Sequence, residues 1–264
     1  MQSQSAHARS LAASVAGQPG DWAVGAGIHA ITFLTRVDRE SYREEGLTWY
    51  RTLNGYGITP GQRDAKGVTF RTFDPAARIL TCFACHSTGP LSLGKEDQVI
   101  PHELGVRCEV CHGPAAAHVR DPRNALRTPA QLNASAMNGF CGSCHRIDSE
   151  TGEEITDLRD ARNARDQPLR LAASSCFRQS AGRLTCLTCH SPHAELEQRA
   201  EAYNARCIGC HAAVKHRQPT AGQACATCHM PRIPNGENLS FANHRIAVYR
   251  PGEPVLPISA RAQP

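Results

Sequence analysis

The sequence is poor in the side chains from which a protein interior is usually built. Aromatic residues make up 5% of the 264 residues and hydrophobic residues 41%, while 21 Gly and 17 Pro interrupt the periodic segments. A chain of this length can bury a core without disulfide bridges. Because so little apolar material is present, the composition indicates that a bound cofactor fills part of the interior.

Two further absences exclude classes of function. No run approaches the roughly eighteen consecutive apolar residues of a membrane-spanning helix, so we predict no transmembrane segment. No block of like charges occurs, and the formal charge of +5 is spread along the chain, so we expect no nucleic-acid binding. The first residues lack a convincing secretory signal. We therefore expect that a signal was removed or that the start is truncated.

Cysteine is the residue present in excess, and its spacing is regular. Twelve of the 13 cysteines fall into six copies of Cys-x-x-Cys-His. The copies are Cys82, Cys85 and His86; Cys108, Cys111 and His112; Cys141, Cys144 and His145; Cys186, Cys189 and His190; Cys207, Cys210 and His211; and Cys225, Cys228 and His229. In haem c attachment the two thiols bind the haem vinyl groups and the histidine becomes the proximal iron ligand. The pattern therefore predicts six haems c.

Three other uses of paired cysteines are less consistent with this pattern. Zinc knuckles, thioredoxin-like dithiols and iron–sulfur clusters all use Cys-x-x-Cys spacings, but none gives a role to a histidine that follows all six pairs.

Haem attachment also predicts a periplasmic or extracellular location, since bacteria attach haem outside the cytoplasmic membrane. Six ferric haems with ionised propionates would change the formal charge of +5 to about −1. Arginine makes up 26 of the 29 basic residues and suits propionate pairing, although a GC-rich genome gives the same bias.

The second axial ligand of each iron decides between electron transfer and catalysis. Of the seven histidines outside the motifs, we expect His7 to lie in solvent. The six candidate distal ligands are His29, His102, His118, His193, His216 and His244. His193 follows proximal His190 too closely to reach the opposite face of the same iron, so it serves another haem or none. The same argument applies to His118 and His216.

Other side chains are weaker candidates for an iron ligand. Met137 and Met230 are alternative donors, but Met230 directly follows a proximal histidine and is better explained by packing. Cys176 is the one cysteine outside the motifs, and we expect a buried thiol. If every site is bis-histidine, the protein passes electrons and binds no substrate at iron. One missing ligand would allow a small molecule to bind there.

The motifs divide the chain into regions. We predict a flexible tail over 1–19, a haem-free β-leaning cap over 20–81, a hexahaem region over 82–250 and a Pro-rich tail over 251–264. Helices are predicted over Thr156–Ala164, Leu169–Phe177 and Ala194–Arg206. The predicted fold class is mainly α with much irregular loop, wrapped around stacked haems, with a small β-containing N-terminal segment.

Four stretches resemble a known group of proteins: Gly105–Pro114 with His118, Leu184–His193, Cys228–Pro231 and His244–Ile246. They are similar to multihaem c-type cytochromes related to the tetrahaem cytochrome of ammonia oxidisers, a group that also resembles pentahaem nitrite reductases and octahaem hydroxylamine oxidoreductases. The resemblance implies that His118, His193 and His244, followed by His216, are distal ligands. It also implies a further attachment motif upstream, which this sequence lacks.

The resemblance leaves three hypotheses for function. The leading one is an electron carrier that connects redox partner proteins through six mostly bis-histidine haems. The second is a haem oxidoreductase that acts on a small nitrogen or sulfur compound at one open haem. No motif has the lysine that marks the catalytic haem of the nitrite reductases, and Tyr203 has no local feature of a crosslinking tyrosine. The third is a protomer of a larger extracellular conduit, as an oligomer or filament.

Overall fold

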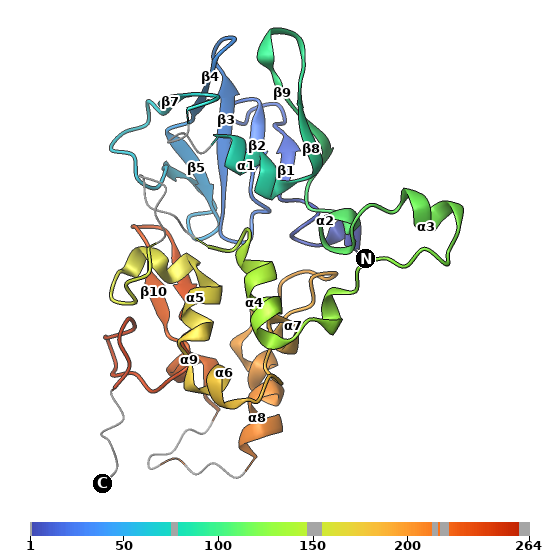
Figure 1. The fold of residues 1–264 in the computed structure, drawn as a ribbon. Coiled ribbons are helices and arrows are strands. Elements are labelled where there is room, and N and C mark those ends of the chain that lie inside the picture. The colour runs from blue at the N-terminus through green and yellow to red at the C-terminus, as the bar shows by residue number, and fades with distance from the viewer. Residues whose placement is uncertain (1, 75–78, 147–154, 213–215, 217–221, 259–264) are drawn as a thin grey trace. The chain divides into compact units, whose positions relative to one another are not determined.

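The computed structural model describes residues 2–74, 79–146, 155–212, 216 and 222–258 (Figure 1). The chain forms two compact units. The first contains Met1–Gln131 together with Ser191–Leu196, and the second contains Leu132–His190 together with Glu197–Pro264. None of the helices in the described ranges has both the length and the apolar character needed to span a membrane.

Seven short strands form an antiparallel sheet in the first unit (Figure 1). They are β1 (Leu11–Ala13), β2 (Trp22–Val24), β3 (Ala30–Arg36), β4 (Ser41–Glu44), β5 (Leu47–Tyr50), β6 (Gly55–Ile58) and β7 (Val68–Arg71). The order is β1-β2-β3-β4-β7, and β5 pairs with both β3 and β6. In the turn before β6, Asn54 has a φ of 45°, a left-handed conformation that asparagine tolerates.

The first attachment motif is packed onto this sheet. Helix α1 (Ile79–His86) places Phe83, which lies between the two motif cysteines, at 0% exposure. Its ring meets Trp22 edge-on at 5.6 Å between centroids and Tyr42 at 5.8 Å. The hydroxyl of Tyr42 in turn accepts a hydrogen bond of 3.0 Å from the backbone N–H of Val99. The core of the sheet therefore fixes the position of the motif helix.

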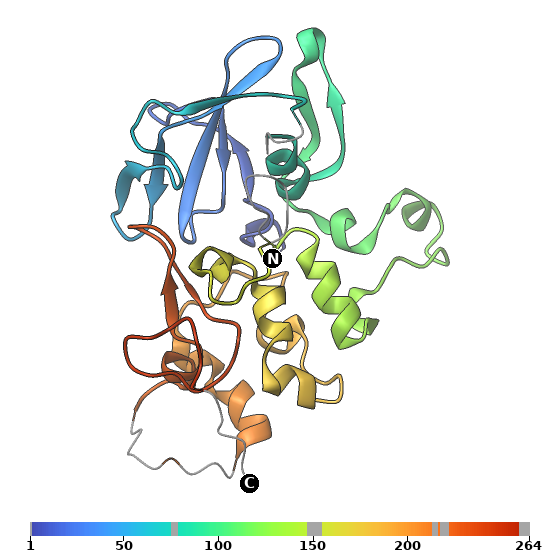
Figure 2. The same ribbon diagram turned by 60° about the vertical axis from the view of Figure 1, so that its left-hand side comes forward.

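The rest of the first unit extends from α1. Strands β8 (Ser87–Leu93) and β9 (Val99–Leu104) form an antiparallel hairpin with the 3-10 turn η2 (Lys95–Asp97) at its tip. Figure 2 shows this hairpin beside α1. The remaining elements are η1 (Gln2–Gln4), α2 (Cys108–His112), α3 (Ala116–Arg120) and η3 (Pro129–Gln131). The first two motifs thus belong to the same unit as the sheet, and the predicted division at residue 81 is not where the compact units separate.

Both predicted tails differ from the structure. Within 1–19, β1 pairs with β2, and Ser5 and Ala8 are buried. This segment packs closely against Gly105. The backbone oxygen of Ala8 occupies the place where a Cβ on Gly105 would stand, so a residue with a side chain would not fit there. At the other end, residues 251–258 fold back, and the N–H of Ile258 donates to the oxygen of Val248 at 2.8 Å. Residues 259–264 of the predicted Pro-rich tail lie outside the described residues.

The second unit consists mostly of short helices and loops. Its elements are α4 (Ala134–Gly142), η4 (Ala161–Arg165), α5 (Gln167–Ala172), α6 (Ser175–Gln179), α7 (Cys186–Cys189), η5 (Ala200–Tyr203), α8 (Asn204–His211), α9 (Cys225–His229) and the hairpin of β10 (Arg232–Pro234) with β11 (Ser240–Ala242). The predicted mainly α fold therefore describes this unit, whereas the first unit is largely a sheet. The three predicted helices are each present only in part, as shorter helices or 3-10 turns.

A buried arginine organises the second unit. Arg170 on α5 is 0% exposed, and its guanidinium donates to Asn163 O, Leu158 O, Asp160 O and Asn243 Oδ1, each at 3.2 Å. These bonds join the turn before α5 to the segment after β11. Hydrogen bonding of this kind satisfies the donors of a buried polar group, but it brings no carboxylate into direct contact with the charge.

Candidate haem sites

All six attachment motifs lie on or at the end of helices, which are α1, α2, α4, α7, α8 and α9. Residues at i and i+3 share one face of a helix. The two cysteines of a motif are therefore presented to the same side, as two bonds to one porphyrin require. This local geometry follows from the spacing alone.

Motifs that are separated in sequence lie next to each other in the second unit. The thiol of Cys186 forms a hydrogen bond with that of Cys141, which lowers the pKa of Cys186 to about 7. Cys207 is similarly hydrogen-bonded to Cys225, and burial together with this neighbour raises the pKa of Cys207 to about 11. The third motif is thus adjacent to the fourth, and the fifth to the sixth.

Several motif histidines are held by backbone carbonyls. The Nδ1 of His86 lies 3.0 Å from Ser10 O, that of His112 lies 2.9 Å from Arg127 O, and that of His229 lies 2.8 Å from Ala247 O. A carbonyl only accepts, so Nδ1 carries the proton in each ring. The lone pair is then on Nε2, the tautomer in which second-shell hydrogen bonds commonly fix a metal-binding imidazole.

Three motif histidines each face a histidine from outside the motifs. The ring centroids are 6.0 Å apart for His112 and His193, with the ring planes 15° apart. They are 6.2 Å apart for His190 and His244, and 6.2 Å for His216 and His229. A metal-bound imidazole nitrogen lies about 2 Å from its metal and the ring centre about 1 Å further, so two imidazoles on opposite sides of one metal have centroids about 6 Å apart. The three spacings fit a shared iron.

The pair of His190 and His244 is the best enclosed. Burial lowers the pKa of His190, and it is the main cause that lowers the pKa of His244 to about 4. Both imidazoles are therefore neutral at pH 7, which is the state that binds a metal. Ser174 holds the segment of His244 from two sides: its hydroxyl donates to His244 O at 2.8 Å and accepts from Ile246 N at 2.8 Å.

The other predicted distal ligands are placed differently. His102 is an exposed side chain on β9, and His118 on α3 has its Nδ1 2.9 Å from Asn124 O. Neither lies against another imidazole among the described residues. His29 immediately precedes β3, and its carbonyl accepts from Arg51 N at 2.9 Å. His7, expected in solvent, is only partly exposed and has its Nδ1 3.4 Å from Pro192 O.

The sequence did not predict that Tyr203 lies beside the motif histidine His190. The Tyr203 ring lies edge-on to His190 at 5.7 Å, and its hydroxyl donates to Glu197 O at 2.6 Å. Its position four residues before a motif gave no signal of this contact with a different motif.

Two candidate sulfur ligands are buried at least in part. Met137 is 2% exposed, with its sulfur 3.8 Å from Cys141 Sγ, and burial raises the pKa of the Cys176 thiol.

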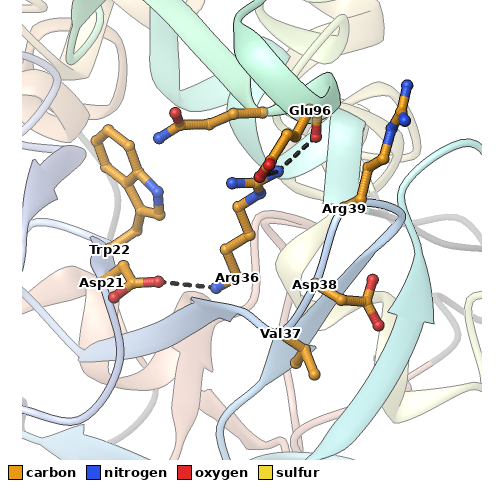
Figure 3. Close-up of a pocket in the computed structure, with 8 residues that line it drawn as sticks. Asp21, Trp22, Arg36, Val37, Asp38, Arg39 and Glu96 are labelled. Atoms are coloured by element: carbon orange, nitrogen blue, oxygen red, sulfur yellow. Dashed lines mark hydrogen bonds and ion pairs between the residues drawn. The ribbon is translucent and has the colours of Figure 1, made fainter.

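A cavity of about 600 Å³ lies in the first unit at the end of β3 (Figure 3). Its lining residues are Asp21, Trp22, Arg36, Val37, Asp38, Arg39, Glu96 and Gln98. The guanidinium of Arg36 donates to Glu96 O, and the Arg36 N–H donates to Asp21 Oδ2 at 2.8 Å. The lining contains no cysteine or histidine, so this cavity is not a haem site.

Two comparisons of the amino-acid sequence with known proteins match cytochromes. The family described as Cytochrome c554 and c-prime matches residues 60–113. The multiheme cytochrome MtrA of Shewanella baltica (strain OS185) is 22% identical over 173 residues, covering 50% of this chain and 52% of that protein. The chain thus spans about half the length of this curated relative.

The fold also has a counterpart among solved structures. The crystal structure of the outer cell wall cytochrome OcwA matches with a TM-score of 0.60 at 14% identity, and the match covers 93% of this chain and 76% of the other. At this identity the likeness concerns the fold. The motifs and these comparisons agree: the chain is similar to multihaem c-type cytochromes, in a family model over residues 60–113, in one curated relative and in the fold of a solved cytochrome.

Proposed function

We propose that the chain is an electron-transfer cytochrome with six haems c, one at each Cys-x-x-Cys-His motif, most of them bis-histidine. The observation that carries the proposal is the set of three facing imidazole pairs, at 6.0 to 6.2 Å between centroids. Each pair joins one motif histidine to one from outside the motifs. Packed aromatic rings such as Phe33 and Tyr56 also lie 6.1 Å apart, so the spacing supports the proposal only because each of the three pairs combines a motif histidine with a histidine from outside the motifs.

The paired residues assign a ligand to three sites. His193 serves the site of His112, His244 serves that of His190, and His216 serves that of His229. When bound, haem c supplies reversible one-electron chemistry at iron. Two imidazoles fill both axial positions, so these residues leave no position for a substrate. The contacts of Cys186 with Cys141 and of Cys207 with Cys225 support closely spaced haems.

The surroundings of such a carrier follow from its chemistry. Its partners are redox proteins that donate and accept single electrons, and its location is the periplasm or the cell exterior, where haem c is attached. The name of OcwA, an outer cell wall cytochrome, supports the exterior. We also propose that the chain is related to the tetrahaem cytochrome of ammonia oxidisers. We propose further that it assembles into an oligomer or filament.

The haem count and the spin state test the proposal together. Chain matured in a host competent for haem c should carry six covalent haems by mass and by pyridine haemochrome assay. Its oxidised spectrum and electron paramagnetic resonance should be dominated by low-spin haem. Fewer than six haems, or mostly high-spin iron, would refute it.

One observation favours a second function, the reduction or oxidation of a small nitrogen or sulfur compound. His211 is exposed and lies against no imidazole in the described part of the chain. The second unit has four motif histidines but only two others, His216 and His244, and both face different motifs. His211 therefore receives no second imidazole from its own unit, which favours a position there for a small ligand.

Carbon monoxide tests this second function. If the position opposite His211 is open, the reduced protein binds about one carbon monoxide per chain. The double variant Cys207→Ala with Cys210→Ala should lose one haem and the carbon monoxide signal. The matched variant Cys225→Ala with Cys228→Ala should lose one haem and keep the signal. Reduced protein that binds no carbon monoxide would exclude the open site.

A further inference from the structure

The second unit contains a buried positive charge that the attachment motifs do not explain. Arg170 is 0% exposed, yet all its hydrogen-bond acceptors are neutral oxygens, namely three backbone carbonyls and one amide. Within the described residues it forms no ion pair with a carboxylate. Nearby Asp160 pairs with Arg162 instead, at 2.6 Å.

A buried cation with no carboxylate in direct contact is costly. An apolar side chain of the same volume could be buried with a smaller loss of folding free energy. We therefore ask what the charge of Arg170 contributes. Burial lowers the pKa of Arg170 and the charge of Arg245 lowers it further, while Tyr249, Asp160 and Asp166 act in the opposite direction. The guanidinium nevertheless remains protonated at neutral pH, since the ordinary pKa of arginine lies above 12.

This charge lies close to a candidate iron ligand. Arg170 Nη1 donates to Asn243 Oδ1, and Asn243 immediately precedes His244. The same Oδ1 accepts from the backbone N–H of Arg245 at 2.9 Å, and the charge of Arg245, the residue after His244, acts on Arg170. A single side chain, that of Asn243, thus connects the guanidinium of Arg170 to the backbone on either side of His244.

We propose that Arg170, assisted by Arg245, raises the reduction potential of the haem held by His190 and His244. This haem is then reduced before haems of lower potential. The inference rests on the proposed ligation by His190 and His244. Reduction adds one negative charge to the haem, and a fixed positive charge in a medium of low dielectric constant stabilises that added charge. Arg170 therefore acts through its charge, in addition to its hydrogen bonds.

Redox titration of the six-haem protein, followed by absorbance and by electron paramagnetic resonance, tests the inference. In Arg170→Gln one of the six midpoint potentials should fall, with at least a tenfold change in the ratio of oxidised to reduced haem, or about 59 mV for one electron. Arg170→Lys keeps the charge and should stay close to the wild type. Arg245→Gln should lower the same midpoint by less.

The control is Arg178→Gln. Arg178 is an exposed arginine on α6 that donates to Ala173 O at 3.0 Å, and its loss should move no midpoint. Unchanged midpoints in Arg170→Gln, with six low-spin haems retained, would overturn the inference. If that variant loses haem or gains a high-spin signal, Arg245→Gln decides: a lowered midpoint supports the role of charge and an unchanged one overturns it.

The proposed ligation has a separate readout. A low-spin spectrum that persists in His244→Ala would refute ligation by His244, whatever the potentials show. Unchanged midpoints in the arginine variants, together with a high-spin haem in His244→Ala, would refute only the role of the charges. The two failures can therefore be told apart.

Discussion

Replacing His244 by alanine is the most direct test of the three facing pairs. The side chain is 6.2 Å from His190 between ring centroids, and its backbone is held by Ser174 rather than by the imidazole. The variant should therefore retain its fold and lose only the ligand. One haem in six should change from low spin to high spin, and the reduced protein should gain about one binding site for carbon monoxide per chain.

The matched control is His102→Ala. His102 is exposed on β9 and lies against no imidazole among the described residues, so its loss should leave the spectrum unchanged. Both variants are compared with the wild type by absorbance, electron paramagnetic resonance and carbon monoxide titration. A wholly low-spin spectrum in His244→Ala, with six haems retained, would refute the reasoning from ring spacing.

Three further predictions follow from packing, hydrogen bonding and pKa. Phe83→Ala should lower the free energy of unfolding of the first unit by about 3–5 kcal/mol in a denaturant titration, because Phe83 is 0% exposed, whereas Leu93→Ala on the exposed hairpin should cost far less. Equal costs would argue against the packing described. Ser174→Ala removes two hydrogen bonds at the segment of His244 and should cost about 1–3 kcal/mol, while exposed Ser175→Ala should cost under about 0.5 kcal/mol. Equal melting temperatures would contradict this. The low-spin spectrum should persist from pH 7 to about pH 5, because burial lowers the pKa of the His244 imidazole to about 4 even before iron competes with the proton. Conversion to high spin near pH 6.5 would contradict this assignment.

The proposed attachment residues follow from the sequence because the chemistry of the motif is local, and they stay a prediction. Cys225, Cys228 and His229 need only one turn of helix to present two thiols and an imidazole to one cofactor, and the spacing specifies that turn. The partner of His229 could not be predicted in the same way. It depends on how the chain returns to bring His216 opposite, which spacing along the sequence does not encode.

The secondary structure failed where distant contacts outweighed local preference. The helix predicted over Leu169–Phe177 is divided into α5 and α6 at Ser174, because the Ser174 hydroxyl bonds to the backbone of His244 and Ile246. In the first unit, by contrast, the β-leaning stretch over 20–81 contains β2 to β7. Strand β3 connects them, since it pairs with β2, β4 and β5. The buried position of Arg170 had no sequence signal either, since arginine usually lies at the surface.

The contacts of Cys141 with Cys186 and of Cys207 with Cys225 have a consequence for biosynthesis. Thiols close enough to share a hydrogen are also neighbours for crosslinking, and an oxidising compartment favours the disulfide. If haem is attached at these cysteines as proposed, a chain that folded first would be open to a disulfide between Cys141 and Cys186 or between Cys207 and Cys225. Attachment would then have to precede folding of the second unit, or a reductant would have to keep these thiols reduced.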